Sequence, residues 1–309
     1  MNVVVSHWSA NVAVLAVLAV VAVVHARGLR GVAAGARRTG GGIPPGLGRE
    51  AAAFHGGLLV VVIALLSPLA YWSARYIWVR SVQDVLLANV APAFLVLGAP
   101  WLVLRRGVTL RRPRAPGAGP APGPAAAPAA GPARAGPATG PAAARRAVGT
   151  VIVFNAVWCG WHLPVLYDGA LRHPLVYAAE VVSYLGLGVA FWLQLIGSRP
   201  LSPVLAPLRR VVMLAGTVVA GTLLGMVLVF GYGVAYPGYL GPGHHVLSVV
   251  YDQQTGGAVL WVLVLPVYVT AGVALLIRWL NDEESRALTS GLDQLLKPAK
   301  HAWPSRSGL

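Results

Sequence analysis

Residues 253–277 read QQTGGAVLWVLVLPVYVTAGVALLI, a run of 25 residues without a charged side chain. A helix of roughly 20 such residues is long enough to cross the hydrocarbon layer of a bilayer, which is about 30 Å thick. Charged side chains are rare inside that layer because removing them from water is costly. The stretch therefore predicts a membrane-spanning helix, and the gaps between charged residues elsewhere locate the others.

Six further stretches of the 309-residue chain have the same character. Only 11% of the residues are charged and 57% are hydrophobic, whereas about 25% are charged in an ordinary soluble domain. The sequence thus predicts an all-α integral membrane protein, a bundle of seven transmembrane helices. The six stretches are 1–26, 51–74, 85–104, 147–167, 173–198, which is interrupted only by Glu180, and 211–233.

The distribution of basic residues predicts the orientation of this bundle. The segments 27–50, 105–147, 198–210 and 278–309 hold 21 of the 24 lysines and arginines, and the segments on the other side hold three. Cytoplasmic segments are the basic ones in membrane proteins, so we expect the N-terminus outside and the C-terminus inside. The net charge of +15 is then a topology signal, not a nucleic-acid-binding surface.

Basic residues follow the first stretch instead of preceding it, which favours a retained helix over a cleaved signal peptide.

The chain is expected to divide into four parts. Residues 1–104 hold helices one to three, and residues 148–278 hold helices four to seven. Between them, residues 105–147 form a cytoplasmic loop rich in Pro, Ala, Gly and Arg, too poor in apolar residues to bury a core and therefore predicted to be disordered. Residues 279–309 form a cytoplasmic tail that binds the lipid bilayer surface, in which three acidic residues before spaced leucines predict a short amphipathic helix.

Polar residues of helices three, four, five and seven are expected to meet at the outer end of the bundle. Glu180 either acts directly or pairs as a structural residue with Arg80 or Arg172. His162 is either functional or a core histidine bonded to a neighbouring helix, and Asp252 with its neighbours either joins the site or caps its own helix. Ionisable groups at such depths are candidates for function. The predicted outer polar cluster is Gln83, Asp84, His162, Tyr167, Asp168, Glu180, Asp252 and Gln253.

The sequence predicts neither a resident metal nor an enzyme. It has one cysteine and three methionines, so thiolate cages and methionine-rich copper relays are excluded. The weak candidates for metal ligands are Cys159, His162, His244 and His245. Motifs for nucleophilic or zinc-dependent hydrolysis and for phosphate binding are absent from the sequence.

Short motifs in a fixed order carry a family resemblance across residues 60 to 265. Two of them are Trp161-His162-Leu163-Pro164 and Asp252-Gln253-Gln254, the latter followed by Gly256-Gly257 and Trp261. The chain resembles the CtaG-type family of cytochrome c oxidase assembly factors. The other matching motifs are Ser67-Pro68-Leu69, Gln83, Leu86-Leu87, Val90-Ala91-Pro92, Leu97-Gly98-Ala99-Pro100, Leu166-Tyr167-Asp168, Ala170-Leu171 and Phe191-Trp192.

The resemblance implies a bacterial inner-membrane protein whose partners are cytochrome oxidase subunits. It also implies a role at the outer face, in the maturation of a subunit or of its copper centre. It also implies two histidine pairs, but this chain has Arg80 and Asp84 at one pair and Tyr177 and Val181 at the other. Neither an arginine nor a valine ligates copper as imidazole does, so we expect weak copper binding or none. The alternative function is a small-molecule or ion permease with an outer polar vestibule.

Overall fold

The computed structural model describes residues 7–9, 11–38, 40, 42–108, 140–241 and 248–296, with side chains described as far as residue 289. Within these ranges the ordered elements are helices, and β pairing is limited to one isolated bridge between Ser198 and Leu201. Six of the helices are long and apolar enough to cross a membrane, or seven if the bent pair α7–α8 counts as one span. The predicted all-α membrane class is thereby confirmed, with six to seven candidate spans.

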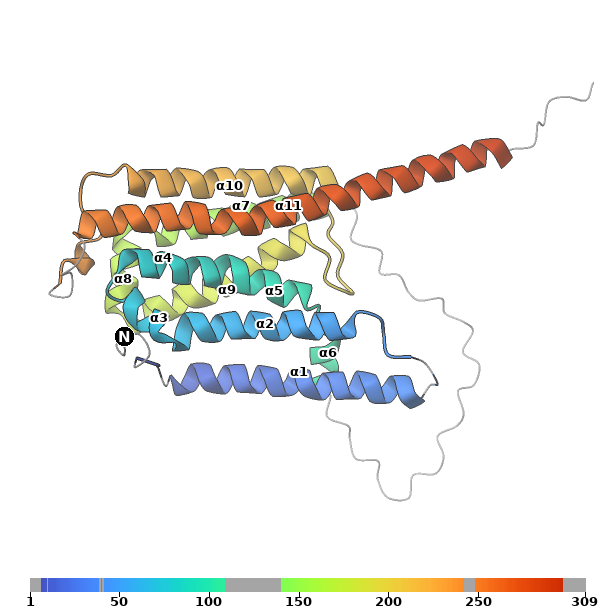
Figure 1. Cartoon of the computed structure of the whole chain (residues 1–309), viewed down its shortest axis with the longest axis horizontal. Helices are drawn as coiled ribbons and strands as arrows, with labels where there is room; N and C mark the ends of the chain where they lie inside the picture. Colours follow the sequence, from blue (N-terminus) through green and yellow to red (C-terminus); the bar gives the residue numbers. More distant parts are fainter. Residues whose placement is uncertain are drawn as a thin grey trace, which may run out of the picture.

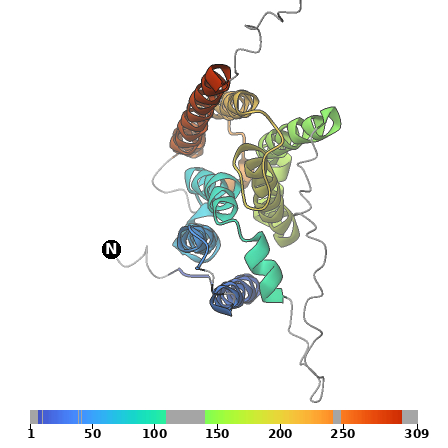
Figure 2. The ribbon, with the colours of Figure 1, turned by 90° about the vertical axis from the view of Figure 1, so that its right-hand side faces the viewer.

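The long helices lie side by side and run alternately in opposite directions (Figure 1). Figure 2 looks along the bundle from the end at which α2, α7 and α10 begin. The elements are α1 (Val12–Arg38), α2 (Leu47–Leu66), α3 (Pro68–Ser73), α4 (Ile77–Val85), the π-helical turn η1 (Leu86–Val90), α5 (Ala91–Leu97), α6 (Trp101–Val108), α7 (Pro141–Trp161), α8 (Pro164–Arg172), α9 (Pro174–Leu195), α10 (Pro207–Val229), the 3₁₀ turn η2 (Pro237–Tyr239) and α11 (Val249–Leu296).

Prolines set several of the helix boundaries. Helices α3, α8, α9 and α10 each begin at a proline, whose fixed φ suits the first helical position, where its missing N–H is not needed. Ahead of α3, the Ser67 hydroxyl accepts from the Leu69 N–H at 3.1 Å as the cap. Pro164 cannot continue α7, and the chain bends by 70° into α8.

The third span begins earlier than the sequence predicted. The prediction was 85–104, whereas the apolar helical run is Ile77–Leu97, so Arg80 and Asp84 lie inside it. Counting residues between charges fails here because these two charges are buried together within the protein instead of facing lipid. Residues after 100 form the separate helix α6, which packs on α1: a Cβ on Gly28 would lie 1.9 Å from the Val103 carbonyl oxygen.

Helices α10 and α11 touch backbone to backbone through Gly225 and Gly257. A Cβ on Gly225 would lie 2.9 Å from the Gly257 carbonyl oxygen, and a Cβ on Gly257 would lie 2.8 Å from the Gly225 carbonyl oxygen. Small residues permit such close approach between membrane helices. Close packing was the reading expected for the glycines of this helix, although Gly216 and Gly221 meet open space.

Helix α11 continues beyond the bundle as one 48-residue helix to Leu296 (Figure 1). The tail was expected to hold a separate short helix, but its described part is the extension of the last span. The predicted loop 105–147 is helical at both ends, where α6 reaches Val108 and α7 begins at Pro141. Residues 109–139 of that prediction lie outside the described residues.

Candidate functional site

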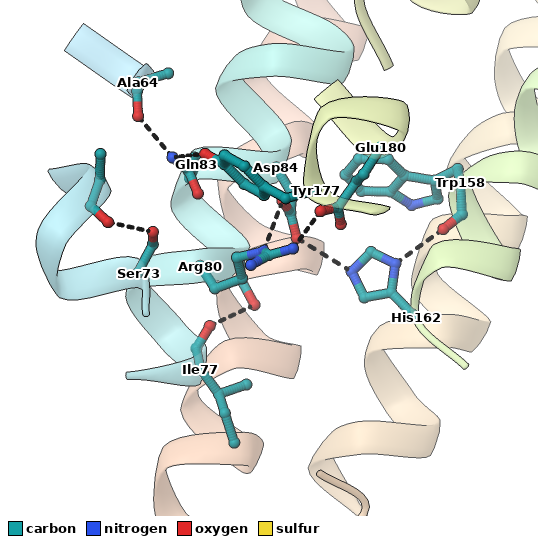
Figure 3. A network of polar contacts seen from close by, with 12 residues as sticks. Ala64, Ser73, Ile77, Arg80, Gln83, Asp84, Trp158, His162, Tyr177 and Glu180 are labelled. Atoms are coloured by element: carbon teal, nitrogen blue, oxygen red, sulfur yellow. Dashed lines mark hydrogen bonds and ion pairs between the residues drawn. The ribbon is translucent and has the colours of Figure 1, made fainter. Parts of the chain in front are cut away.

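Six side chains from three helices gather at one end of the bundle, and we refer to them as the Arg80 cluster (Figure 3). Helix α4 contributes three of them, the end of α7 one, and α9 two. All but Tyr177 are almost fully buried, with exposed fractions between 0 and 5%. The Arg80 cluster is Arg80, Gln83, Asp84, His162, Tyr177 and Glu180.

Arg80 lies between the two carboxyl groups of the cluster. Its Nη2 forms an ion pair with Glu180 Oε2, and its Nε lies 3.5 Å from Asp84 Oδ1. Its guanidinium carbon lies 5.1 Å from the ring centre of Tyr167 and 5.2 Å from that of Tyr177. Glu180 therefore has Arg80 as its partner, one of the two arginines expected from the sequence.

His162 and Gln83 tie the cluster to the backbone of neighbouring segments. His162 Nδ1 donates to the Trp158 carbonyl at 2.8 Å, and its Nε2 faces Asp84 Oδ2 at 3.9 Å. Gln83 Nε2 donates to the Ala64 carbonyl of α2 at 2.7 Å and to the Tyr177 hydroxyl at 2.9 Å. The side-chain hydrogen bond of His162 is thus to α7, which it ends, and not to a neighbouring helix.

The cluster has more polar atoms than the described chain satisfies. Buried polar groups are ordinarily hydrogen-bonded, yet several here have no hydrogen-bond partner among the described residues. This end of the bundle therefore retains buried polar atoms that the described residues leave without a hydrogen bond. These atoms are Asp84 Oδ2, His162 Nε2, Glu180 Oε1, Gln83 Oε1 and the hydroxyl oxygens of Tyr167 and Tyr184.

Asp252 has a separate role from the Arg80 cluster. Its two carboxylate oxygens accept from the N–H groups of Ile77 at 2.8 Å and Trp78 at 3.0 Å. These groups belong to the first turn of α4, where backbone N–H groups lack partners within the helix. Asp252 therefore caps α4 and not its own helix, and it fixes the segment that carries Arg80.

Asp168 and Gln253 hold the loop between α10 and α11. Asp168 Oδ2 accepts from the Gly238 N–H at 2.9 Å. Gln253 Oε1 accepts from the Ala235 N–H at 2.7 Å, and its Nε2 donates to the Gly233 carbonyl at 3.3 Å. Of the eight predicted residues, four belong to the Arg80 cluster, while these two and Asp252 anchor the segments around it.

Two tyrosines of the same loop cover the cluster. The ring of Tyr236 stacks on that of Tyr167, the eighth predicted residue, at 4.1 Å. The Tyr236 hydroxyl donates to the His162 carbonyl at 2.9 Å, and the Tyr239 hydroxyl donates to the Ser73 carbonyl at 3.0 Å. Burial raises the pKa of both tyrosines well above the ordinary value, so their hydroxyls stay protonated and keep these bonds.

The described residues do not fit a copper ion. No group of three or more His, Cys, Asp and Glu side chains among them is placed to hold a metal. At the centre of the Arg80 cluster, a guanidinium already lies against both carboxyl groups. Cys159 is a half-buried free thiol, and His244 and His245 lie outside the described residues. No metal-dependent step is derived for this chain.

Sequence reasoning missed Arg80, Tyr236 and Tyr239 at this end of the bundle and Asn89 near the middle of its span. Arg80 was considered as a partner for Glu180 and as the replacement of a family histidine, but not as a member of the predicted cluster. Tyr236 and Tyr239 were in a segment predicted to be a loop. Asn89 was missed because it is uncharged, although its side chain accepts from the Tyr268 hydroxyl and its carbonyl from Trp192 Nε1. The structure marks Asn89 by a π-helical turn at residues 86–90, a feature that occurs often at functional sites, and no signal in the sequence indicates this turn.

Comparison with known proteins agrees with this arrangement of motifs. The family model described as cytochrome c oxidase caa3 assembly factor (Caa3_CtaG) matches residues 29–282. That range contains most of the chain and every residue of the Arg80 cluster. Searches of curated proteins and of solved structures find no match. The resemblance stated from the sequence is confirmed, and the chain belongs to the cytochrome c oxidase caa3 assembly factor family.

Proposed function

We propose that this membrane protein assists the maturation of a cytochrome c oxidase subunit or its copper centre from the extracytoplasmic side. The observation that carries the proposal is the Arg80 cluster, a buried and charge-paired network in a chain of the oxidase assembly family. The end of the bundle that holds it is poor in basic residues, which supports an extracytoplasmic location. The network acts as a rigid support and not as a reaction centre.

A rigid support is useful here because the segments that it joins carry highly exposed apolar and aromatic side chains. Val165 of α8 is 83% exposed, Leu175 of α9 is 84% exposed and Tyr232 of the α10–α11 loop is 92% exposed. The Arg80 cluster and the anchors of the loop hold these three elements together. We name Val165, Leu175 and Tyr232 the end face and propose that an immature oxidase subunit docks there.

Gene deletion with complementation tests this function. Without the gene, we expect oxidase content and haem a absorbance to fall, and the wild-type gene to restore both. A Val165→Asn/Leu175→Asn/Tyr232→Ala variant should accumulate as a folded protein and fail to restore them, because it changes only exposed side chains. A matched control, Ile43→Asn/Leu201→Asn, changes exposed residues that lie outside the candidate spans, at the opposite end of the bundle from the end face. Normal oxidase content in the deletion strain would exclude the proposal.

Copper loading provides an independent prediction. Purified protein titrated with Cu(I) against a competing chelator is expected to bind weakly or not at all, because the Arg80 guanidinium already lies against both carboxyl groups of the Arg80 cluster. Cys159→Ser is the control, since it removes the single thiol of the chain. A tight one-to-one complex that survives in Cys159→Ser would contradict the prediction.

A further inference from the structure

A groove with apolar walls and a basic rim lies between the first turns of α7 and α10. Its volume is about 580 Å³, and its walls include Val148, Ile152 and Val212, with Arg145 and Arg209 at the rim. Both helices begin at the end of the bundle that faces the viewer in Figure 2, opposite the Arg80 cluster. Nothing in the proposed function uses this groove.

The depth of the groove matches one leaflet of a bilayer. On α7 its lining runs from Ala144 to Ile152. About one turn further along, Asn155 Nδ2 donates to Thr217 Oγ1 at 3.0 Å and joins the two helices beyond the groove. From Asn155 back to Arg145 is ten residues, or about 15 Å at 1.5 Å per residue. The hydrocarbon layer is about 30 Å thick, so the rim lies near headgroup level when Asn155 lies near the midplane.

The two arginines of the rim are available to a ligand. Both are exposed, and neither forms an ion pair with a residue in the described part of the chain. The neighbouring Arg210 is different, because its Nε donates to the Leu205 carbonyl at 2.7 Å and is used by the protein itself. Two guanidinium groups above an apolar groove are complementary to a phosphate above an acyl chain.

We propose that this groove binds one anionic phospholipid of the surrounding leaflet. Its phosphate contacts Arg145 and Arg209, and one acyl chain lies along Val148, Ile152 and Val212. A zwitterionic lipid has the same chains and phosphate but carries a compensating positive charge. The two guanidinium groups therefore select the anionic headgroup.

Native mass spectrometry of the purified full chain with added phosphatidylglycerol or phosphatidylcholine tests the headgroup contact. We expect one phosphatidylglycerol bound in preference to phosphatidylcholine. Each basic residue near a membrane surface contributes about 1 kcal/mol to the binding of anionic lipid, so Arg145→Gln/Arg209→Gln should weaken this complex on the order of thirtyfold. The control Arg37→Gln/Arg38→Gln removes two exposed arginines from the last turn of α1 and should bind as wild type does. Equal binding of the two lipids, or no effect of the rim variant, overturns the proposal.

A second variant tests the apolar part of the groove. A Cβ on Gly149 has no heavy atom within 4 Å, so Gly149→Leu fills the groove without disturbing the helices and should displace the lipid. Gly186→Leu of α9 is the matched control, because Gly186 also meets open space and lies outside the groove. A photo-crosslinking residue at Ile152, which is 61% exposed, should yield a lipid adduct in membranes. An adduct with a helix of another protein would overturn the proposal, as would lipid binding that survives Gly149→Leu.

Discussion

Arg80→Met is expected to destabilise the protein by about 3–5 kcal/mol, the usual cost of removing one partner from a buried ion pair. Methionine fills a similar volume, so the loss is electrostatic: Asp84 and Glu180 remain buried without the guanidinium between them. The measurement is thermal unfolding of the detergent-solubilised protein, with the fraction of protein that stays monodisperse as the readout. We expect little folded protein to be recovered.

Two further variants separate this explanation from a general effect of losing an arginine. Arg172→Met removes an arginine that is 62% exposed and lies 3.7 Å from Asp168, and exposed pairs contribute about 0–1 kcal/mol. The triple variant Arg80→Met/Asp84→Asn/Glu180→Gln removes all three charges together and should recover much of the lost stability. If the triple variant is no more stable than Arg80→Met, the charge pairing is not the reason for the loss.

Gly225→Leu is expected to destabilise the protein by about 3 kcal/mol, the upper end of the usual cost of overpacking. The added Cβ would lie 2.9 Å from the Gly257 carbonyl oxygen and 3.2 Å from the Trp261 Cβ. The nearest obstacle is backbone, so a change of side-chain rotamer cannot relieve the clash and α10 must move away from α11. The same thermal assay measures the loss.

Gly216→Leu is the matched control for this prediction, since Gly216 lies in the same helix, is exposed and meets open space. Its effect should stay within about 0.5 kcal/mol, as for most surface substitutions. Equal stability of the two variants would show that α10 and α11 do not depend on close contact at Gly225.

The all-helical membrane class could be predicted from the sequence because the hydrocarbon layer imposes the same length and apolar composition on every span. A run such as residues 253–277 needs no knowledge of its neighbours to be recognised as a span. It was also predictable that Gln83, Asp84, His162 and Glu180 lie at the same end of the bundle. Successive spans run in opposite directions, so the position of a residue along its span gives its depth in the membrane. These inferences depend on position along a helix and not on which helices touch.

Pairwise contacts were beyond such reasoning. Asp252 caps a helix that begins 175 residues earlier in the chain, and no local pattern distinguishes this from capping its own helix. Counting residues between charges also placed the start of the third span at residue 85 and left Arg80 outside it. That rule assigns to each charged side chain the free-energy cost of facing lipid, whereas Arg80 lies between two carboxyl groups inside the protein.

The ion pair between Arg80 and Glu180 also constrains the order of events during synthesis. The two residues are separated by 100 positions, so at translation rates of about 5–20 residues per second, α4 emerges roughly 5–20 s before its partner exists. In that interval Asp84, one helical turn away, is the acid already present beside Arg80. Asp84 thus serves as the counter-ion of Arg80 in the nascent chain, until α9 enters the membrane and Glu180 forms its ion pair with Arg80.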